Sequence, residues 1–449
     1  LDFTRRYLAA IQAVTVDDIR RVAATLTDER LSLTILDPLE SAESVRVAKP
    51  ARVREEIEVH NLPGGLTLAL IPDRRVPLPS ETAAANGLNQ LLAATLSKGT
   101  LTRSAQEIAV TLESLGASIG ANTGNNAILV QASGLAPDFA IIADVFAEVI
   151  VLPALPEEAL GREKTSQLAS LEEALEDPLH CAFRVLRDAV FSGSGYGLDA
   201  LGGVESLAAL DRPALATHHA RHFSAANLTL AIAGDFEPAA VLEIIREKFA
   251  GLPVGDCWTA PASQLAPGSN LTRHLPKKQA VLAIGFPGST ISGADRHALA
   301  MIQEYASDMA GPLFSRIREE LGLAYQVGAT QFLGYDAGLF SFYLATSPSQ
   351  ADFARSELLA EIAKIAAHGI PTEAFERVRS TVLSGLAIQQ QSPASIARHV
   401  ALDLLFGHPA DQHRRLPEAY KALTATAVAE TAHRIFSVIP TVVMVLPED

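Results

Sequence analysis

Residues 86–100 of this 449-residue chain read Asn-Gly-Leu-Asn-Gln-Leu-Leu-Ala-Ala-Thr-Leu-Ser-Lys-Gly-Thr. The leucines recur at the three- and four-residue spacing of a helix that buries one face, and Asn86 is suited to cap its first turn. The same helix carries an amide and two methyl groups, at Gln90, Ala93 and Ala94. The stretch therefore predicts a helix whose side chains at these three positions neither bind a metal ion nor activate a water.

This stretch resembles the active-site helix of the insulinase/pitrilysin-like zinc peptidases, the inverzincins, which carry His-x-x-Glu-His there. In that alignment Gln90 and Ala94 stand at the two histidines, and Ala93 stands at the glutamate. Register from Asp177-Pro178 places the family's third zinc ligand, a glutamate, at Ser170, and a small shift of register would place it at Glu172 or Glu173 instead. The resemblance therefore implies a degenerate zinc site, with no cofactor in this chain and zinc in a partner unit.

The resemblance covers nearly the whole chain. Its sharpest match is residues 312–325, and further matches lie around Asn61, Tyr196 and Asn227. It implies an α+β fold of two related halves, each a mostly antiparallel sheet with helices packed on one face, as in the mitochondrial processing peptidase and insulinase. The strand and helix patterns along the chain indicate the same architecture. In the family, two such units close around a peptide-digesting chamber.

The chain also departs from the family pattern just before the degenerate helix. Eleven residues separate Arg75 from Gly87, where the family usually has a strand and a loop. Either the sheet has lost a strand here, or a segment is absent from the sequence.

The chain repeats part of itself. A helix pattern followed by an apolar strand at residues 10–38 recurs at 419–447 with a constant offset of 409, and a weaker copy lies at 210–233. Repeats of this period indicate duplicated domains. We therefore expect four segments: a trailing helix and strand of a preceding unit plus linker (1–49), a first half with the degenerate zinc site (50–260), a linker (261–269), and a second half (270–449).

Charge, hydropathy and cysteine content limit the classes of partner and the location of this chain. A net charge of −15 argues against nucleic acid and anionic membranes, because both repel an acidic surface. The most apolar stretch, residues 139–155, is interrupted by charges and is too short to span a bilayer. Cys181 and Cys257 form no CxxC pattern and fit either redox compartment. Because bacterial relatives are often exported, we favour the periplasm over the cytoplasm.

Arg318 and Tyr325 are the candidate substrate-binding residues. Arg318 is expected in the last turn of a helix that Gly322 ends, and Tyr325 at the start of the next strand, so both can point into one cleft. Their guanidinium and phenol donors suit peptide carbonyls and a developing oxyanion. Alternatively, Arg318 complements the helix dipole and Tyr325 is a half-buried sheet residue. The resemblance favours binding, since in the family this pair, from the half without zinc, holds the substrate backbone.

Two other clusters carry weaker signals. His218 and His222 are one helical turn apart, as metal-binding pairs are, but without a nearby carboxylate the sequence favours an ordinary half-exposed helix. His180 lies beside Cys181, but no third group completes a catalytic thiol site. Neither cluster is assigned a function.

Taken with the resemblance, these features predict a non-catalytic, substrate-binding subunit of a two-unit zinc metallopeptidase, inactive alone. It closes a peptide-degrading chamber and supplies Arg318 and Tyr325 to a zinc-bearing partner of the same family, as a heterodimer or a fused precursor. The alternatives are a structural homologue that assembles without proteolysis and a standalone peptide-binding module. Retention of the Arg/Tyr pair favours the first.

Overall fold

The computed structural model describes residues 13–15, 17–18, 59–61, 67–69, 72–77, 81–124, 126–192, 195–256 and 262–448. The chain divides into two units, Leu1–Glu55 and Glu56–Asp449. In the first, the Thr15 hydroxyl donates to the Asp18 carboxylate at 2.7 Å and accepts from the Asp18 backbone N–H at 3.2 Å. The rest of the tail expected at 1–49, including its strand at 31–36, lies outside the described residues.

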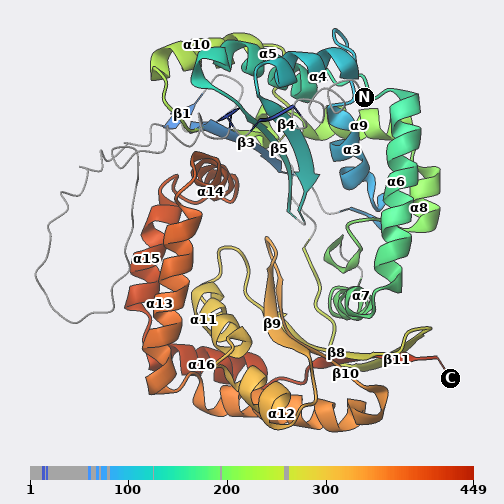
Figure 1. The fold of residues 1–449 in the computed structure, drawn as a ribbon, viewed down its shortest axis with the longest axis vertical. Helices are drawn as coiled ribbons and strands as arrows, with labels where there is room; N and C mark the ends of the chain where they lie inside the picture. The colour runs from blue at the N-terminus through green and yellow to red at the C-terminus, as the bar shows by residue number, and fades with distance from the viewer. Residues whose placement is uncertain are drawn as a thin grey trace, which may run out of the picture. The chain divides into compact units, whose positions relative to one another are not determined.

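The first sheet of the second unit has six strands in the order β1-β2-β6-β3-β5-β4 (Figure 1). Neighbours pair antiparallel except β2 and β6, which are parallel. The strands are Val59–Asn61 (β1), Thr67–Ala69 (β2), Pro72–Pro77 (β3), Ser118–Thr123 (β4), Ala127–Ser133 (β5) and Thr229–Ile232 (β6). In β3, residues 72–75 pair with β6 and residues 76–77 with β5. The strand β3 therefore joins β6 to β5, so that all six strands form one sheet.

The second sheet has the order β7-β11-β8-β10-β9, with only β7 and β11 parallel. Its strands are Asn270–Leu275 (β7), Ala280–Gly288 (β8), Gln326–Leu333 (β9), Gly338–Thr346 (β10) and Thr441–Pro447 (β11). This order repeats β2-β6-β3-β5-β4, including the parallel pair. The two copies of the sequence repeat at 210–233 and 419–447 thus form the same structure, a helix that leads into a central strand.

Helices separate and cover the strands. Those that precede β7 in the chain are α3 (Leu88–Leu96), α4 (Ala105–Ser114), α5 (Phe139–Val151), α6 (Glu157–Glu176), α7 (Pro178–Val190), α8 (Val204–Ala209), α9 (Arg212–His222) and α10 (Pro238–Lys248). Those that follow β7 are α11 (Arg296–Ser307), α12 (Ala351–His368), α13 (Thr372–Gln389), α14 (Pro393–Leu405), α15 (Gln412–Ala422) and α16 (Ala425–Phe436). Short 3₁₀ segments are η2 (Ala83–Ala85), η3 (Ala136–Asp138), η4 (Gly195–Gly197), η5 (Ala225–Asn227) and η7 (Pro348–Gln350). The fold is α+β, as the sequence predicted, and its sheets are mostly antiparallel.

The central strands are buried on both faces, and the two faces have different partners. Along β8, Leu282 and Ile284 pack into a core with α11, α12, α13 and α16, which come from the same part of the chain. The alternate residues Val281 and Ala283 pack against α7, which precedes β7 in the sequence. Helices from one half therefore cover one face of this sheet, as expected, while the opposite face is covered by a helix from the other half.

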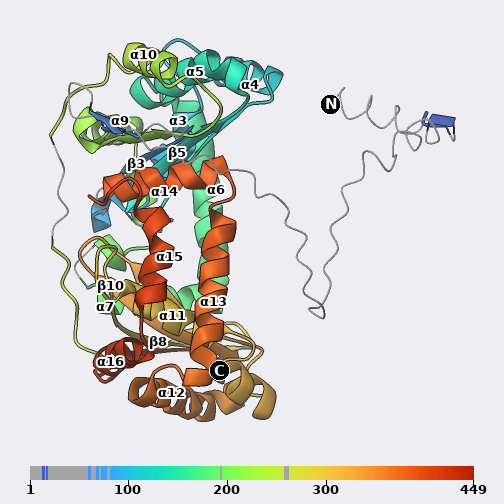
Figure 2. The ribbon, with the colours of Figure 1, turned by 90° about the vertical axis from the view of Figure 1, so that its left-hand side faces the viewer.

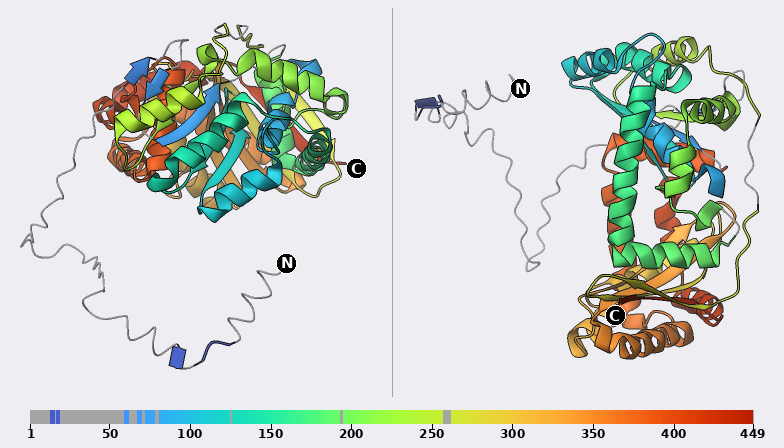
Figure 3. Two further views of the ribbon diagram at one scale, coloured as in Figure 1. Left: turned by 90° about the horizontal axis from the view of Figure 1, so that it is seen from above. Right: turned by 90° about the vertical axis from the view of Figure 1, so that its right-hand side faces the viewer.

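The first sheet receives a helix in return. Ala231 of β6 packs in a small cluster with Ala397, Val400 and Ala401 of α14. A long helix precedes each of the two helices that pack on the other half's sheet. The helix α6 leads to α7 on the second sheet, and α13 leads to α14 on the first (Figures 2 and 3). The exchange of α7 and α14 ties residues 56–449 into one unit.

One helix departs from the expected geometry. The helix expected to carry Arg318 in its last turn is a π-helix, η6, over Leu313–Glu320. The backbone N–H of Leu321 accordingly donates to the Arg316 carbonyl at 3.2 Å, five residues back. Gly322 then ends the element with a φ of +60°, as the sequence indicated.

Candidate functional site

The degenerate helix α3 is capped by an unexpected residue. Gly87, with a φ of +87°, occupies the N-cap instead of Asn86. The Glu81 carboxylate accepts hydrogen bonds from the Gly87 backbone N–H and, at 2.6 Å, from the Asn89 backbone N–H. Burial raises the pKa of Glu81 above its ordinary value, against the opposing effect of these bonds. Asn86 instead donates its side-chain amide to Glu81 (3.0 Å) and to the Asp199 carbonyl (2.7 Å).

The three positions compared with the zinc motif lie on α3 and are buried to different degrees. The carbonyl of the Gln90 side chain accepts a hydrogen bond from the Thr123 hydroxyl on β4. Ala93 is 3% exposed and belongs to the core of the first sheet. Ala94 is half-buried. An amide already engaged by a hydroxyl and two methyl groups offer no ligand set for zinc.

Ser170, aligned with the third ligand, is exposed on α6, which packs against α3. The contact between these helices is made elsewhere. The buried amide of Gln167 donates to the Gly87 carbonyl at 3.0 Å and to the Leu201 carbonyl at 2.8 Å. Lys98 forms an ion pair with Glu163 at 2.8 Å. One hydrogen bond to the N-cap of α3 and one ion pair to Lys98, just beyond its C-cap, thus link α6 to α3.

Across the described parts of the chain, no cluster of three or more His, Cys, Asp or Glu side chains is arranged to hold a metal ion. The chemistry of Gln90, Ala93, Ala94 and Ser170 agrees, since none is a preferred zinc ligand. These residues do not fit the zinc of the motif.

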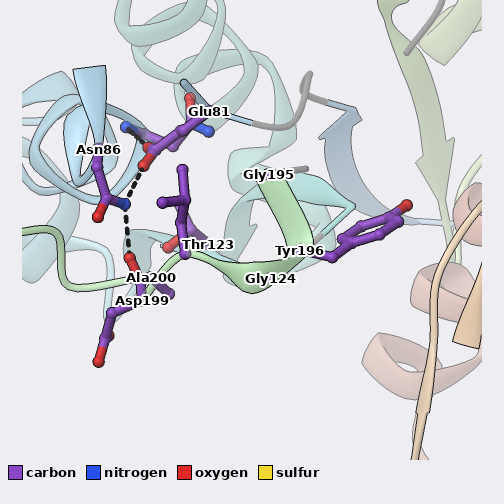
Figure 4. A pocket seen from close by; sticks show the side chains of 10 residues that line it. Glu81, Asn86, Thr123, Gly124, Gly195, Tyr196, Asp199 and Ala200 are labelled. Carbon is purple, nitrogen blue, oxygen red and sulfur yellow. Dashed lines mark hydrogen bonds between the residues drawn. The ribbon is translucent and has the colours of Figure 1, made fainter. Parts of the chain in front are cut away.

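A small open pocket lies beside the N-terminus of α3 (Figure 4). Glu81, Asn86 and Asn89 line one side, and Thr123 and Gly124 of the β4 end line another. The remaining wall is the segment Gly195–Ala200, apart from Gly197. Figure 4 shows the Tyr196 ring pointing away from the pocket, so that this residue contributes mainly its backbone there.

Arg318 and Tyr325 lie on either side of the Gly322 turn. The backbone N–H of Leu323 donates to the Ile317 carbonyl at 2.9 Å, which closes the end of η6. The Arg318 guanidinium lies over the Phe314 ring, 4.7 Å from its centroid. Arg318 is exposed, and Tyr325, immediately before β9, is 52% exposed. Tyr325 is therefore not the half-buried sheet residue of the alternative interpretation, and both donors face solvent.

The histidines of α9 are less exposed than the sequence suggested. His222 is 3% exposed, and the His218 Nε2 lies 2.8 Å from the Asn89 Oδ1 on α3. Burial, reinforced by neighbouring positive groups, lowers the pKa of His218 to about 3 and that of His222 to about 4. His218 therefore packs α9 against α3 as a neutral ring, with the His222 ring 4.5 Å from it on the same helix.

His180 and Cys181, the second weak cluster, lie in different environments. His180 bonds the Asp199 carboxylate at 2.8 Å, while Cys181 is buried on α7 against the second sheet. Burial raises the pKa of the Cys181 thiol above its ordinary value, which disfavours the reactive thiolate. The absence of a catalytic assignment for this pair agrees with its surroundings.

Comparison with known proteins identifies the family of this chain. Residues 79–202 match the family model described as insulinase (peptidase family M16), and residues 209–382 match the model of the peptidase M16 inactive domain. The chain belongs to the insulinase-like M16 family. No described helix is long and apolar enough to cross a bilayer.

M16 relatives resemble the chain over most of its length. An uncharacterized zinc protease of Rickettsia bellii is 25% identical over 386 residues, which cover 85% of this chain and 92% of the relative. One of Streptomyces coelicolor is 26% identical over 339 residues, 70% of this chain and 73% of the relative. A solved peptidase M16 inactive domain from Pseudomonas fluorescens has a TM-score of 0.80 at 20% identity, covering 88% of this chain and 98% of that one. A protease from Helicobacter pylori reaches 0.81 at 16% identity, covering 87% and 99%.

Within this M16 chain, sequence reasoning located the aligned positions but missed the groups that surround them. Glu81 and Thr123 were not singled out, because nothing in their local spacing points to α3. Gln167 carried a readable signal: it shares a helical stripe with the buried Leu160 and Leu171, where a polar side chain must find partners.

Proposed function

We propose that this M16 chain is the non-catalytic, substrate-binding subunit of a two-unit zinc metallopeptidase. The observation that carries the proposal is α3 itself, a well-packed helix with Gln90, Ala93 and Ala94 at the aligned positions. Without a metal site or a general base, the chain has no means of hydrolysis at this helix. The match of residues 209–382 to the model of the peptidase M16 inactive domain supports the family membership on which this assignment rests.

The second element of the proposal is Arg318 with Tyr325. Both side chains are exposed, and the π-helix and Gly322 turn fix the backbone between them. Guanidinium and phenol groups donate hydrogen bonds to peptide carbonyls without needing a proton transfer. We assign them to holding the substrate backbone next to the zinc of a partner unit that carries His-x-x-Glu-His.

The test uses the chain together with candidate zinc-bearing M16 proteins encoded by the same organism. Peptidase activity is expected only in one such mixture, and the two proteins are expected to co-purify. In that mixture Arg318→Ala and Tyr325→Phe each lower kcat/KM by roughly 10²–10³, the cost of removing one oxyanion-type donor. Arg162→Ala is a matched control, because Arg162 is exposed on α6 and, among the residues that the structure describes, forms its ion pair with Glu158 four residues earlier.

The results separate the alternatives. A stable complex without peptidase activity indicates a structural homologue, and peptide binding by the isolated chain without any complex indicates a binding module. Near-wild-type kcat/KM for both variants in an active mixture contradicts the role assigned to Arg318 and Tyr325. Circular dichroism of each variant checks that the fold is retained.

A further inference from the structure

Tyr196 joins three segments that are far apart in the sequence. Its hydroxyl donates to the Asn126 Oδ1 at 2.7 Å and accepts from the Tyr335 backbone N–H at 2.7 Å. The Asn126 side-chain N–H in turn donates to the Leu333 carbonyl at 3.0 Å. Asn126 lies in the β4–β5 turn, and Leu333 and Tyr335 lie at the β9–β10 turn. Three hydrogen bonds thus connect the turns of the two sheets.

The Tyr196 ring is held firmly in place. It is 6% exposed and makes edge-to-face contacts with Phe191 and Phe332, at centroid distances of 5.7 and 5.1 Å. A Cβ atom at Gly334 would lie 2.8 Å from the ring, so this glycine permits the close approach. The hydroxyl group that makes the connection therefore has a fixed position.

The backbone of Tyr196 is anchored as well. The Arg187 guanidinium of α7 donates to the Tyr196 carbonyl from Nε (3.0 Å) and from a terminal nitrogen (2.8 Å). The same guanidinium lies over the Phe332 ring, 4.8 Å from its centroid. Burial raises the pKa of Tyr196, which keeps the hydroxyl protonated and able to donate.

The joined turns belong to the edge strands of both sheets. β4 ends the first sheet, and its last residue, Thr123, bonds Gln90 of α3. β9 ends the second sheet and begins immediately after Tyr325. The exchanged helices α7 and α14 fasten the sheets through their faces. The Tyr196 contacts fasten them at the edges, on the side where the degenerate helix lies.

We propose that Tyr196 is a positioning residue: its hydroxyl fixes the β9 edge of the second sheet relative to α3 and β4, and so fixes where Tyr325 is presented. The first part of this statement concerns the isolated chain. The second part rests on the proposed function, because it concerns substrate held by Tyr325.

Hydrogen exchange of the isolated chain tests the first part. Tyr196→Phe removes the hydroxyl but keeps the ring, so the Tyr335 amide loses its acceptor and is expected to exchange on the order of tenfold faster. Amides in the middle of β10, such as Phe342, keep their rates. Tyr335→Phe is the matched control, since Tyr335 contributes its backbone N–H to the contact and its ring is 60% exposed. A Tyr335 amide that exchanges within about twofold of wild type in Tyr196→Phe overturns the proposal.

Asn126→Asp gives a second measure. The aspartate keeps an acceptor for the Tyr196 hydroxyl but loses the donor to the Leu333 carbonyl. Tyr196 and Asn126 belong to one hydrogen-bond network. The double variant with Tyr196→Phe and Asn126→Asp is therefore expected to accelerate exchange at the β9–β10 turn by less than the product of the two single effects. Independent, multiplicative effects contradict a shared joint.

Kinetics of an active mixture test the second part. If Tyr196 positions Tyr325, Tyr196→Phe lowers kcat, and adding Tyr325→Phe costs clearly less than Tyr325→Phe costs in the wild-type background. A merely structural loss of folded protein gives multiplicative effects instead, and that result overturns the positioning of Tyr325. If the wild-type chain is inactive in every mixture, the proposed function fails, while the exchange experiment still decides whether the joint exists.

Discussion

At position 90 the side chain is an amide, and its carbonyl is already engaged by the Thr123 hydroxyl. An amide and a hydroxyl satisfy each other without a third group. Ala93 and Ala94 remove the remaining polar atoms from this face of α3. The residues present here suit a permanently metal-free helix.

The first prediction concerns metal. The purified chain is expected to contain no stoichiometric zinc, and EDTA is expected to leave its unfolding temperature unchanged, because no folded-state ligand set contributes binding energy. Elemental analysis and a thermal melt with and without EDTA measure both. One tightly bound zinc per chain, coordinated by residues of α3 or α6, contradicts it.

A second prediction concerns Gln167, whose amide bonds two backbone carbonyls that connect α6 to α3 and to the segment before α8. Gln167→Leu leaves the Gly87 and Leu201 carbonyls without this donor and is expected to lower the free energy of unfolding by about 1–3 kcal/mol. Urea unfolding measures the change. Gln106→Leu, at an exposed position of α4, is the control and is expected to have little effect. Equal stability of the two variants contradicts a linking role.

Among the elements, α9 shows how burial makes stability depend on pH. His218 and His222 have pKa values of about 3 and about 4 in the folded chain, because burial disfavours their charged forms, against an ordinary value of 6.5. The unfolded chain therefore binds protons between pH 6.5 and 4 while the folded chain does not. Their contribution to stability is complete above pH 6.5 and is lost as the pH falls through this window.

The matching experiment follows the free energy of unfolding from pH 7 to pH 4.5. We expect it to fall with acid in the wild-type chain and to fall less steeply in His222→Leu, in which one of the two depressed groups is gone. The two pH slopes of the free energy of unfolding must be compared, because carboxylates also titrate near pH 4.5 and contribute to the slope in both proteins. Parallel slopes for the two proteins would show that His222 does not stay neutral in the folded state.

The elements also show what sequence patterns can and cannot predict. The apolar spacing over Arg296–Ser307 predicts a helix, and the structure has α11 there. Ser104 and Glu107 have the spacing of a capping box, and that box opens α4. The cap of α3 was misassigned to Asn86, because that residue satisfies the local rule while Glu81 acts from outside the usual positions. The π-helical form of η6 has no signature in apolar spacing alone.

The exchange of helices was beyond sequence patterns for a different reason. An apolar stripe on α7 or α14 indicates that the helix is covered, but it does not indicate by which sheet. The aligned site was located because the frame of Gly87, Lys98 and Gly99 persists around the substituted positions. The groups that link it to α6 and β4 come from other elements and need the structure.

For the whole molecule, each sheet completes its burial only with a helix from the other half. Residues 56–256 and 262–448 produced as separate chains are therefore expected to expose apolar faces and to unfold without a cooperative transition. Mixing the two restores one cooperative transition, because α7 and α14 regain their sheets. Thermal melts with a dye for exposed apolar surface measure this. Cooperative unfolding of either piece alone contradicts the expectation.

The same exchange has a consequence during synthesis. The strand β6 is complete at Ile232, but the α14 residues that cover Ala231 emerge from the ribosome about 160 residues later, which at ~5–20 residues per second takes roughly 8–30 s. Throughout that interval the nascent first half carries an uncovered apolar strip. We therefore expect the nascent chain to bind chaperones that recognise exposed apolar surface, and slower translation between β6 and α14 to prolong that binding.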